Sequence, residues 1–187
     1  YVVYGTKDQQ FKYNASLQHF INKKKWTVLG LQLNKDIDQV GIYNEMATFS
    51  SIFDSFVRFG TLVKPYMHTQ QKLWLKGNLT KGIQPSLTLR TRKVDPLHPF
   101  AIKDLLSNQA DATLESIRVS ELVLSTRFSF GERWVVNGNS RSSLGSKKPI
   151  VTLKYIMGLP NILGSNVEYQ RFFINWRHRF KLGGFGN

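Results

Sequence analysis

The chain has 187 residues, with 26 lysines and arginines against 12 aspartates and glutamates, so its formal net charge is +14. Its hydrophobic fraction of 41% and its aromatic fraction of 13% argue against intrinsic disorder, since disordered chains are poor in aromatic residues. The absence of cysteine excludes disulfide frameworks, thiolate zinc sites, iron–sulfur clusters and cysteine nucleophiles. No run reaches the roughly 18 apolar residues of a membrane-spanning helix, which excludes a helical membrane protein.

Apolar and polar residues alternate along several segments, with turn-forming residues between them. This period of two is typical of strands that are wetted on one face. In chain order, we expect seven strands, at residues 10–20, 26–34, 69–78, 83–93, 117–130, 149–159 and 167–182. The first two strands are expected to form a hairpin, and so are the third and fourth.

Three segments break the alternation. Residues 44–59 carry apolar side chains three and four positions apart, which predicts a short amphipathic helix in a long connection. Residues 94–114 contain two prolines and predict an irregular loop with one helical turn near residues 102–106. Residues 137–148 are almost entirely polar and predict a solvated loop. No repeat or linker indicates a boundary, so we expect a single domain over residues 1–187.

The length of the strands bears on the class of β protein. Globular strands usually have about 3 to 10 residues, whereas tilted strands that cross a bilayer need about 9 to 11, and most of the expected strands are of the longer kind. The alternation leaves open whether the apolar face packs in a sandwich or meets lipid. The polar faces combine arginine and lysine with amides and hydroxyls, which favours a hydrated lumen. The sequence therefore predicts an all-β fold, an antiparallel transmembrane β-barrel with about seven or eight long strands.

The predicted strand number also suggests that the barrel is partial. Bacterial single-chain barrels usually have an even number of strands, from about 8 upward, and seven is odd. The chain begins in an apparently extended segment at Tyr1, and the glycines at 183, 184 and 186 resemble a turn before a further strand. We therefore expect this chain to be a fragment of a longer barrel protein.

Three stretches, at residues 26–41, at 49–53 and from 166–172 through 181–186, resemble a bacterial family. They are similar to the barrel region of outer-membrane proteins that carry a carboxypeptidase-regulatory-like domain upstream of a domain of unknown function. That family is distantly similar to the surface-antigen, or Bam-type, assembly barrels. The resemblance implies an outer-membrane β-barrel. The assembly barrels carry a Val-Arg-Gly-Phe or Val-Arg-Gly-Tyr motif, which has no match here, because Val57-Arg58-Phe59-Gly60 has a different order.

The residue types that support catalysis do not occur in catalytic patterns. Four histidines are scattered along the chain: His19, His68, His98 and His178. There is no His-Glu-x-x-His and no Gly-x-Ser-x-Gly sequence. Glu121 and Glu168 are the carboxylates expected well inside strands, and cations such as Arg118 and Arg171 lie near them in sequence, so we interpret them as ion-pair partners in the lumen. The sequence predicts no enzyme and no catalytic, cofactor-binding or metal site.

The net charge supports an alternative function. Lysine and arginine neutralise nucleic-acid phosphates, and aromatic side chains on a basic sheet can stack on bases. The alternative is therefore a soluble basic β-barrel or sandwich that binds nucleic acid. The cations are spread over nearly every strand and turn of the sequence, which we interpret as evidence against a single binding stripe. A third hypothesis, an envelope hydrolase, has no recognisable site.

The preferred prediction is a protein of the bacterial outer membrane with a transport, membrane-protein assembly or scaffolding role. The expected partners are the lipid bilayer and other outer-membrane proteins in a complex, with no nucleic acid and no cofactor. A positively charged lumen would attract anionic or polar cargo. Long excursions are expected after Asn34, Lys93 and Trp134, all on one side of the membrane.

Alternation assigns individual side chains to the two faces of the predicted barrel. The candidates for the lumen are Arg90, Arg92, Arg127, Arg177 and Arg179. These arginines attract cargo or, in the alternative that we weigh equally, pair with acids elsewhere in the closed barrel. The candidates for contact with lipid are Leu122, Leu124, Phe128, Phe172, Ile174 and Trp176. Aromatic residues near strand ends either form interface girdles or reflect ordinary strand propensity: Tyr13, Trp26, Phe130, Tyr155 and Tyr169.

Overall fold

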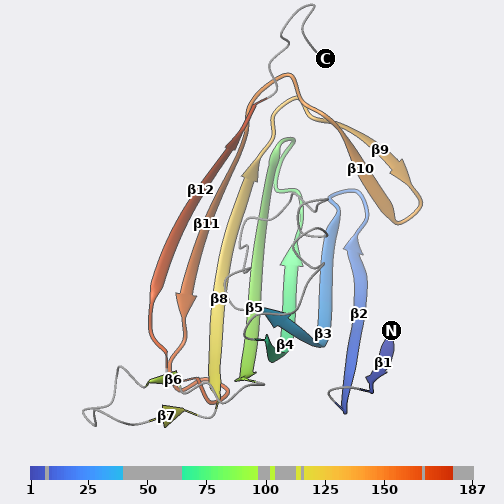
Figure 1. Cartoon of the computed structure of the whole chain (residues 1–187). Helices are drawn as coiled ribbons and strands as arrows, with labels where there is room; N and C mark the ends of the chain where they lie inside the picture. Colours follow the sequence, from blue (N-terminus) through green and yellow to red (C-terminus); the bar gives the residue numbers. More distant parts are fainter. Residues whose placement is uncertain are drawn as a thin grey trace, which may run out of the picture.

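The computed structural model describes residues 1–6, 9–39, 65–96, 102–103, 113–114, 116–165 and 167–178. Eight strands form one antiparallel sheet in the order β1-β2-β3-β4-β5-β8-β11-β12, which is strongly curved (Figure 1). Their bounds are Val2–Gly5 (β1), Gln10–Asn22 (β2), Thr27–Gln39 (β3), Pro65–Lys76 (β4), Ile83–Pro96 (β5), Ile117–Phe128 (β8), Ile150–Gly158 (β11) and Gln170–Arg177 (β12). Among the described residues the outer strands β1 and β12 do not pair with each other, so the sheet is open.

The all-β prediction and its seven strands are confirmed, since each of the seven corresponds to one long strand of this sheet. The structure adds β1, a four-residue edge strand that pairs with β2. Strand β12 begins at Gln170, three residues later than predicted, and the predicted residues 179–182 lie outside the described part of the chain. Within the described ranges, no helix has the length and hydropathy to cross a membrane.

The segment predicted as a solvated loop contains a β-hairpin instead. Strands β9 (Arg133–Asn137) and β10 (Ser140–Gly145) pair across a two-residue connection that includes Gly138, whose φ is 56°. The connection is Gly138-Asn139, and glycine at the first position of a two-residue hairpin turn is a known signal because a type II′ turn needs a positive φ there. The helical turn predicted near residues 102–106 is wrong for Ile102 and Lys103. These two residues form strand β6 (Ile102–Lys103), which pairs with β7 (Thr113–Leu114). The helix predicted at residues 44–59 lies outside the described residues.

The two ends of the sheet differ in their connections. Short connections at residues 23–26 and 77–82 mark one end, which we name the turn end. The connections at 40–64, 97–116 and 159–169 leave the opposite end, which we name the loop end. The excursion after Trp134 leaves from the turn end, because β8 runs antiparallel to β5. The prediction of three excursions on one side is therefore wrong for the third.

The register divides the sheet into two faces, because residues directly opposite each other in an antiparallel sheet point to the same side. One cross-strand row consists of Leu17, Leu31, Leu73, Leu89, Leu122 and Met157, and belongs to what we name the apolar face. The adjacent row consists of Ser16, Gln32, Lys72, Arg90 and Glu121, and belongs to the polar face. The leucines of the apolar face are largely exposed, whereas the buried Val28, Val123 and Ile156 lie among the polar-face residues.

One cross-strand pair on the polar face depends on a missing side chain. Gly30 on β3 pairs directly with Trp74 on β4. A Cβ atom built on Gly30 would overlap the indole ring of Trp74. The ring therefore lies across the backbone of Gly30, and the Nζ atom of Lys72 lies 5.2 Å from the ring centroid.

We expect the Gly30→Ala substitution to destabilise the protein by about 1–3 kcal/mol, because the indole must leave its place. In a Trp74→Ala background, the same substitution should be neutral or stabilising by up to about 1 kcal/mol, since glycine is unfavourable within a strand. Denaturant unfolding of the four proteins of this double-mutant cycle measures the coupling. Equal effects of Gly30→Ala in both backgrounds would contradict the proposed contact.

Candidate functional site

The cations of the long strands gather on the polar face. On β4, β5, β8, β11 and β12, the polar-face cations are Lys72, Lys76, Arg90, Arg92, Arg127, Lys154, Arg171 and Arg177. Glu121 is the single carboxylate on that face of the same five strands, counting the described residues. The cations come from nearly every long strand, as the sequence indicated, but strand alternation collects most of those on the long strands on one side of the sheet.

Four of the five arginines predicted for a lumen, Arg90, Arg92, Arg127 and Arg177, lie on this polar face. Arg179 lies outside the described residues. All six residues predicted to contact lipid lie on the apolar face: Leu122, Leu124, Phe128, Phe172, Ile174 and Trp176. The side chains of Phe172, Ile174 and Trp176 are 61–64% exposed, so they do not pack in a dry core.

Glu121 is the centre of a buried ion-pair cluster. Its side chain is completely buried, and its carboxylate accepts hydrogen bonds from Arg90 Nε and Tyr169 Oη, and from Arg92 at 2.9 Å. A third guanidinium, that of Arg171, lies 3.4 Å from the same carboxylate and donates to the Tyr169 hydroxyl at 2.9 Å. Three arginines around one carboxylate leave the cluster with an excess of positive charge.

The sequence located the carboxylate of this cluster but not all of its partners. Arg118, three residues before Glu121, lies on the apolar face and donates to the carbonyl of Leu163 instead. Glu168, predicted to lie inside a strand, is exposed and precedes β12. Tyr169, a candidate for an interface girdle, binds Glu121 on the polar side. The partners Arg90 and Arg92 come from another strand, so no local sequence signal could identify them.

A second ion pair fixes the base of the β9–β10 hairpin. Arg127 donates two hydrogen bonds to Glu132, at 2.5 and 2.7 Å, and Ser143 donates a third. The Glu132 side chain is 1% exposed. Burial raises the pKa of the Glu132 carboxyl, but the hydrogen bonds from Arg127 and Ser143 more than offset this and hold the pKa below its ordinary value of 4.5.

The hairpin folds over the polar face at the turn end and contacts two turns there. The Arg141 guanidinium lies between two indoles, 4.4 Å from the centroid of Trp134 and 5.0 Å from that of Trp26. It also donates to the side chain of Asn78, in the connection between β4 and β5, at 3.2 Å. Trp26 was also predicted as a candidate for an interface girdle, but its indole stacks with Arg141 on the polar side of the sheet.

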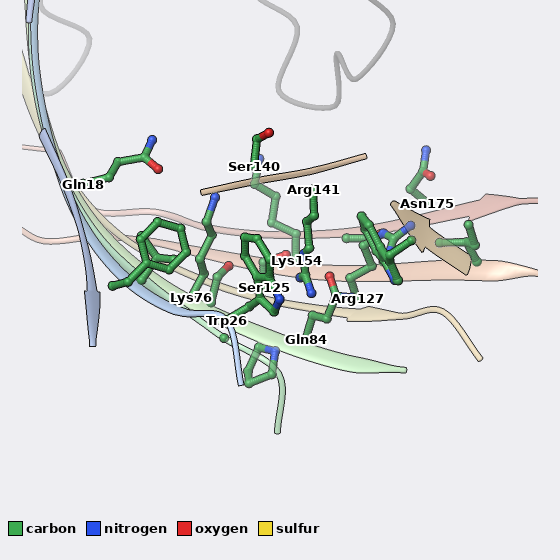
Figure 2. A pocket seen from close by; sticks show the side chains of 18 of the residues that line it. Gln18, Trp26, Lys76, Gln84, Ser125, Arg127, Ser140, Arg141, Lys154 and Asn175 are labelled. Atoms are coloured by element: carbon green, nitrogen blue, oxygen red, sulfur yellow. The ribbon is translucent and has the colours of Figure 1, made fainter. Parts of the chain in front are cut away.

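The hairpin roofs a cavity of about 730 Å³ above the polar face. Figure 2 shows Arg141 pointing from the hairpin toward Lys154 and Arg127 on the strands below, and the sheet curving around the space. Five cations line it, from the hairpin and from strands β4, β8, β11 and β12: Lys76, Arg127, Arg141, Lys154 and Arg177. The other lining residues include amides, hydroxyls and aromatic rings, and none is a carboxylate. We name this cavity the roofed pocket.

This arrangement is suited to attract and hold anions. Guanidinium and ammonium groups bind phosphate and carboxylate through charge-assisted hydrogen bonds, and a concave surface of one sign raises the local concentration of counter-ions. Within the described ranges, no group of three or more histidine, aspartate or glutamate side chains could hold a metal ion.

The Glu121 cluster generates a prediction about stability. Glu121→Gln should destabilise the protein by about 3–5 kcal/mol, because the guanidinium groups of Arg90 and Arg92, which are 11% and 16% exposed, would lose their ion pairs with a completely buried carboxylate. Glu168→Gln removes the same charge from an exposed carboxylate and serves as the matched control. Thermal and denaturant unfolding measure both variants. If Glu121→Gln proved as stable as the control, the cluster would not hold these strands together.

The lowered pKa of Glu132 predicts that the hairpin is sensitive to acid. Because the folded-state pKa lies below 4.5, the ion pair contributes its full stability above about pH 4.5 and loses it as the pH falls through the folded-state value. Hydrogen exchange of the backbone amides of residues 133–145 should therefore lose protection in acid. Glu132→Gln should have lower protection at neutral pH and little further loss. A wild-type hairpin that stays fully protected well below the pKa would contradict this.

Comparison with known proteins identifies the family. The model of the C-terminal domain of a family of unknown function, DUF5686, matches residues 1–187. No curated protein and no solved structure matches the chain. The chain belongs to the family of the DUF5686 C-terminal domain, whose function is unknown.

Proposed function

We propose that this chain is part of an outer-membrane β-barrel whose apolar face contacts lipid and whose cationic polar face lines a passage for anionic or polar solutes. The observation that carries the proposal is the separation of the two faces over the middle of the sheet, with exposed leucines on one side and clustered cations on the other. Further strands beside the open edges β1 and β12 complete the barrel, because unpaired backbone groups are costly in lipid. Bam-type assembly and scaffolding remain the other roles predicted from the sequence.

The apolar side chains form a band that runs obliquely across the strands, as in a tilted barrel. The exposed apolar residues of β12 centre on Ile174, and those of β3 centre on Leu31. The cross-strand row of Ile174 meets β5 at Pro85. The cross-strand row of Leu31 meets the same strand at Leu89, four residues further along. An offset of about four residues across about five interstrand steps inclines the band by about 30° to the cross-strand rows. Strands of membrane barrels tilt by about 35–45° from the bilayer normal, so a band parallel to the membrane plane must be oblique in this way.

At the loop end the apolar band gives way to a row with Gln71, Thr91 and Ser120, and then to a positively charged row. Lys35, Lys93 and Arg118 belong to one cross-strand row of the apolar face, together with Thr69. Long basic side chains at the edge of an apolar band can extend to the level of lipid headgroups, and anionic headgroups attract them. This row supports a membrane boundary at the loop end of the sheet.

The polar face supports a passage because its charge is mainly positive on the strands from β4 to β12, whereas β3 contributes the carboxylate of Asp36. Eight cations and one carboxylate lie on the polar face of the strands from β4 to β12, among the residues that the structure describes. Such a lining raises the local concentration of anions and opposes cations. The hairpin covers one end of this face and would restrict the size of the solutes that pass.

Nucleic-acid binding by a soluble protein is the second candidate function. The stack of Trp26, Arg141 and Trp134 combines aromatic rings with a cation on the basic face, a combination found in single-strand binders. A soluble protein would, however, expose the whole leucine band to water. Soluble monomers rarely expose a contiguous apolar patch larger than a few hundred Å².

Reconstitution of the full-length protein into liposomes tests the proposed function. The protein should require detergent for extraction, float with the liposomes and let chloride pass faster than potassium. Ile174→Lys should reduce insertion by about 2–4 kcal/mol, because a charged side chain then faces the hydrocarbon. Retention of the wild-type protein in buffer, with salt-sensitive binding to an oligonucleotide, would support the second candidate instead.

Asn175→Lys is the matched control, since it places the same charge one residue further along β12 on the polar face. This variant should insert as the wild type does. In a soluble protein, Ile174→Lys would be harmless because Ile174 is 63% exposed. Equal association of the two variants with liposomes would therefore contradict the membrane proposal. If the protein inserts but shows no preference for chloride, the barrel proposal stands and the anion passage is excluded.

A further inference from the structure

The roofed pocket has the size and the chemistry of a binding site. Its volume of about 730 Å³ lies within the range of about 300–1,000 Å³ that is typical of ligand pockets. The strands form its floor and the β9–β10 hairpin forms its roof, so a ligand inside would be contacted from both sides (Figure 2). Its lining is rich in cations and contains no carboxylate.

The spacing of the cations determines the shape of a fitting ligand. Lys76 on β4 and Lys154 on β11 lie in one cross-strand row, separated by Ser86 and Ser125. Three interstrand steps of about 4.8 Å place their backbones about 14 Å apart. Because a lysine side chain reaches about 6 Å from its backbone, one phosphate could bridge these two residues alone. Arg177 lies one strand further on, on β12, and Arg141 approaches from the hairpin, so a ligand that engages all four cations must be extended and must carry several negative groups.

The positions between the two lysines offer hydrogen-bond donors for such a ligand. The hydroxyls of Ser86 and Ser125 occupy the same row, and Arg127 lies in the next row of the polar face. Arg141 approaches from the roof, where its guanidinium is held between two indoles. Guanidinium groups pair with phosphate oxygens in a bidentate manner, so the centre of the pocket is suited to a further phosphate.

An ion pair beside the pocket holds the side chain of Arg127 in place. Glu132 binds Arg127 through both carboxylate oxygens. This pair offsets the charge of Arg127 and positions its guanidinium beneath the hairpin, at 5.6 Å from the Trp134 ring centroid. The positive charge of the pocket is therefore carried mainly by residues to either side of Arg127.

From this geometry we infer that the roofed pocket binds an extended oligoanion, a molecule with several phosphate groups in a row. The ligand lies along the row from Lys76 to Lys154, and Arg141 closes over it from the hairpin. This binding site goes beyond the proposed passage, since it holds a ligand at a defined place. It does not depend on the membrane proposal, because the pocket belongs to the fold itself.

Isothermal titration of the full-length protein in detergent, with inorganic tripolyphosphate as the probe, tests this inference. Tripolyphosphate should bind in a salt-dependent manner, and inorganic phosphate should bind far more weakly. The Lys76→Gln/Lys154→Gln variant should lose about tenfold or more in affinity, since it removes two charge-assisted hydrogen bonds to the ligand. Lys23→Gln/Lys24→Gln is the matched control, because it removes the same charge from the exposed turn between β2 and β3 and should leave the affinity unchanged.

Further variants and probes keep the outcome unambiguous. Lys76→Arg/Lys154→Arg preserves the charge and should retain binding, which separates a lost contact from a lost fold. Micelles that contain an anionic phospholipid distinguish the source of the phosphates: competition with tripolyphosphate assigns them to lipid headgroups, and lack of competition assigns them to a soluble ligand. Absence of tripolyphosphate binding, equal binding of inorganic phosphate, or equal losses in the two glutamine variants would each overturn the inference. None of these results would affect the liposome experiment.

Discussion

The buried pairing of Glu121 with arginines from two other strands is the interaction that opposes a slip of β8 against β5, at the centre of the sheet. Arg90 lies directly opposite Glu121 on β5, Arg92 follows two residues later on the same face, and Arg171 reaches the carboxylate from β12. A slip by one residue would move every side chain of a strand to the other face. It would place the carboxylate among the leucines of the apolar face and leave the arginines without their counter-charge. The cost of that state is the physical reason why the two faces remain separate over so many strands.

Once the register is fixed, the two faces of the sheet require different surroundings. The polar face holds its cations close together, which is tolerable only where water or a counter-ion screens them. The apolar face exposes leucine and aromatic side chains over the middle of the long strands. Water on both sides would leave the apolar band solvated, and an apolar medium on both sides would strip the cations of hydration at great cost. The proposed position at a boundary between lipid and water would satisfy both faces at once.

Much of this architecture is encoded in the period of two along the sequence. The seven long strands and the faces of Arg127 and Ile174 follow from alternation, since burial and polarity act on each strand by itself. The partners of Glu121 could not be predicted, because Arg90 reaches it through cross-strand register, whereas the sequence neighbour Arg118 points to the opposite face. The hairpin was missed because polar composition outweighed the turn signal of Gly138-Asn139. The side of the excursion after Trp134 was wrong because strand direction alternates, so each excursion must be assigned by counting strands.

Trp26 shows how the roof of the pocket and the floor are linked. Its φ of 49° lies in the left-handed region, which costs an L-residue about 1–2 kcal/mol and which glycine or asparagine adopts more easily. A tryptophan at this position is favourable only if its side chain offsets that cost. The indole packs edge-on against Phe20 at 5.4 Å and against the Arg141 guanidinium at 5.0 Å. Because one of these contacts comes from the sheet and the other from the hairpin, movement of the hairpin would remove part of the compensation for the strained turn. The turn between β2 and β3 thus favours the closed hairpin, and a ligand held by Arg141 would stabilise the same state.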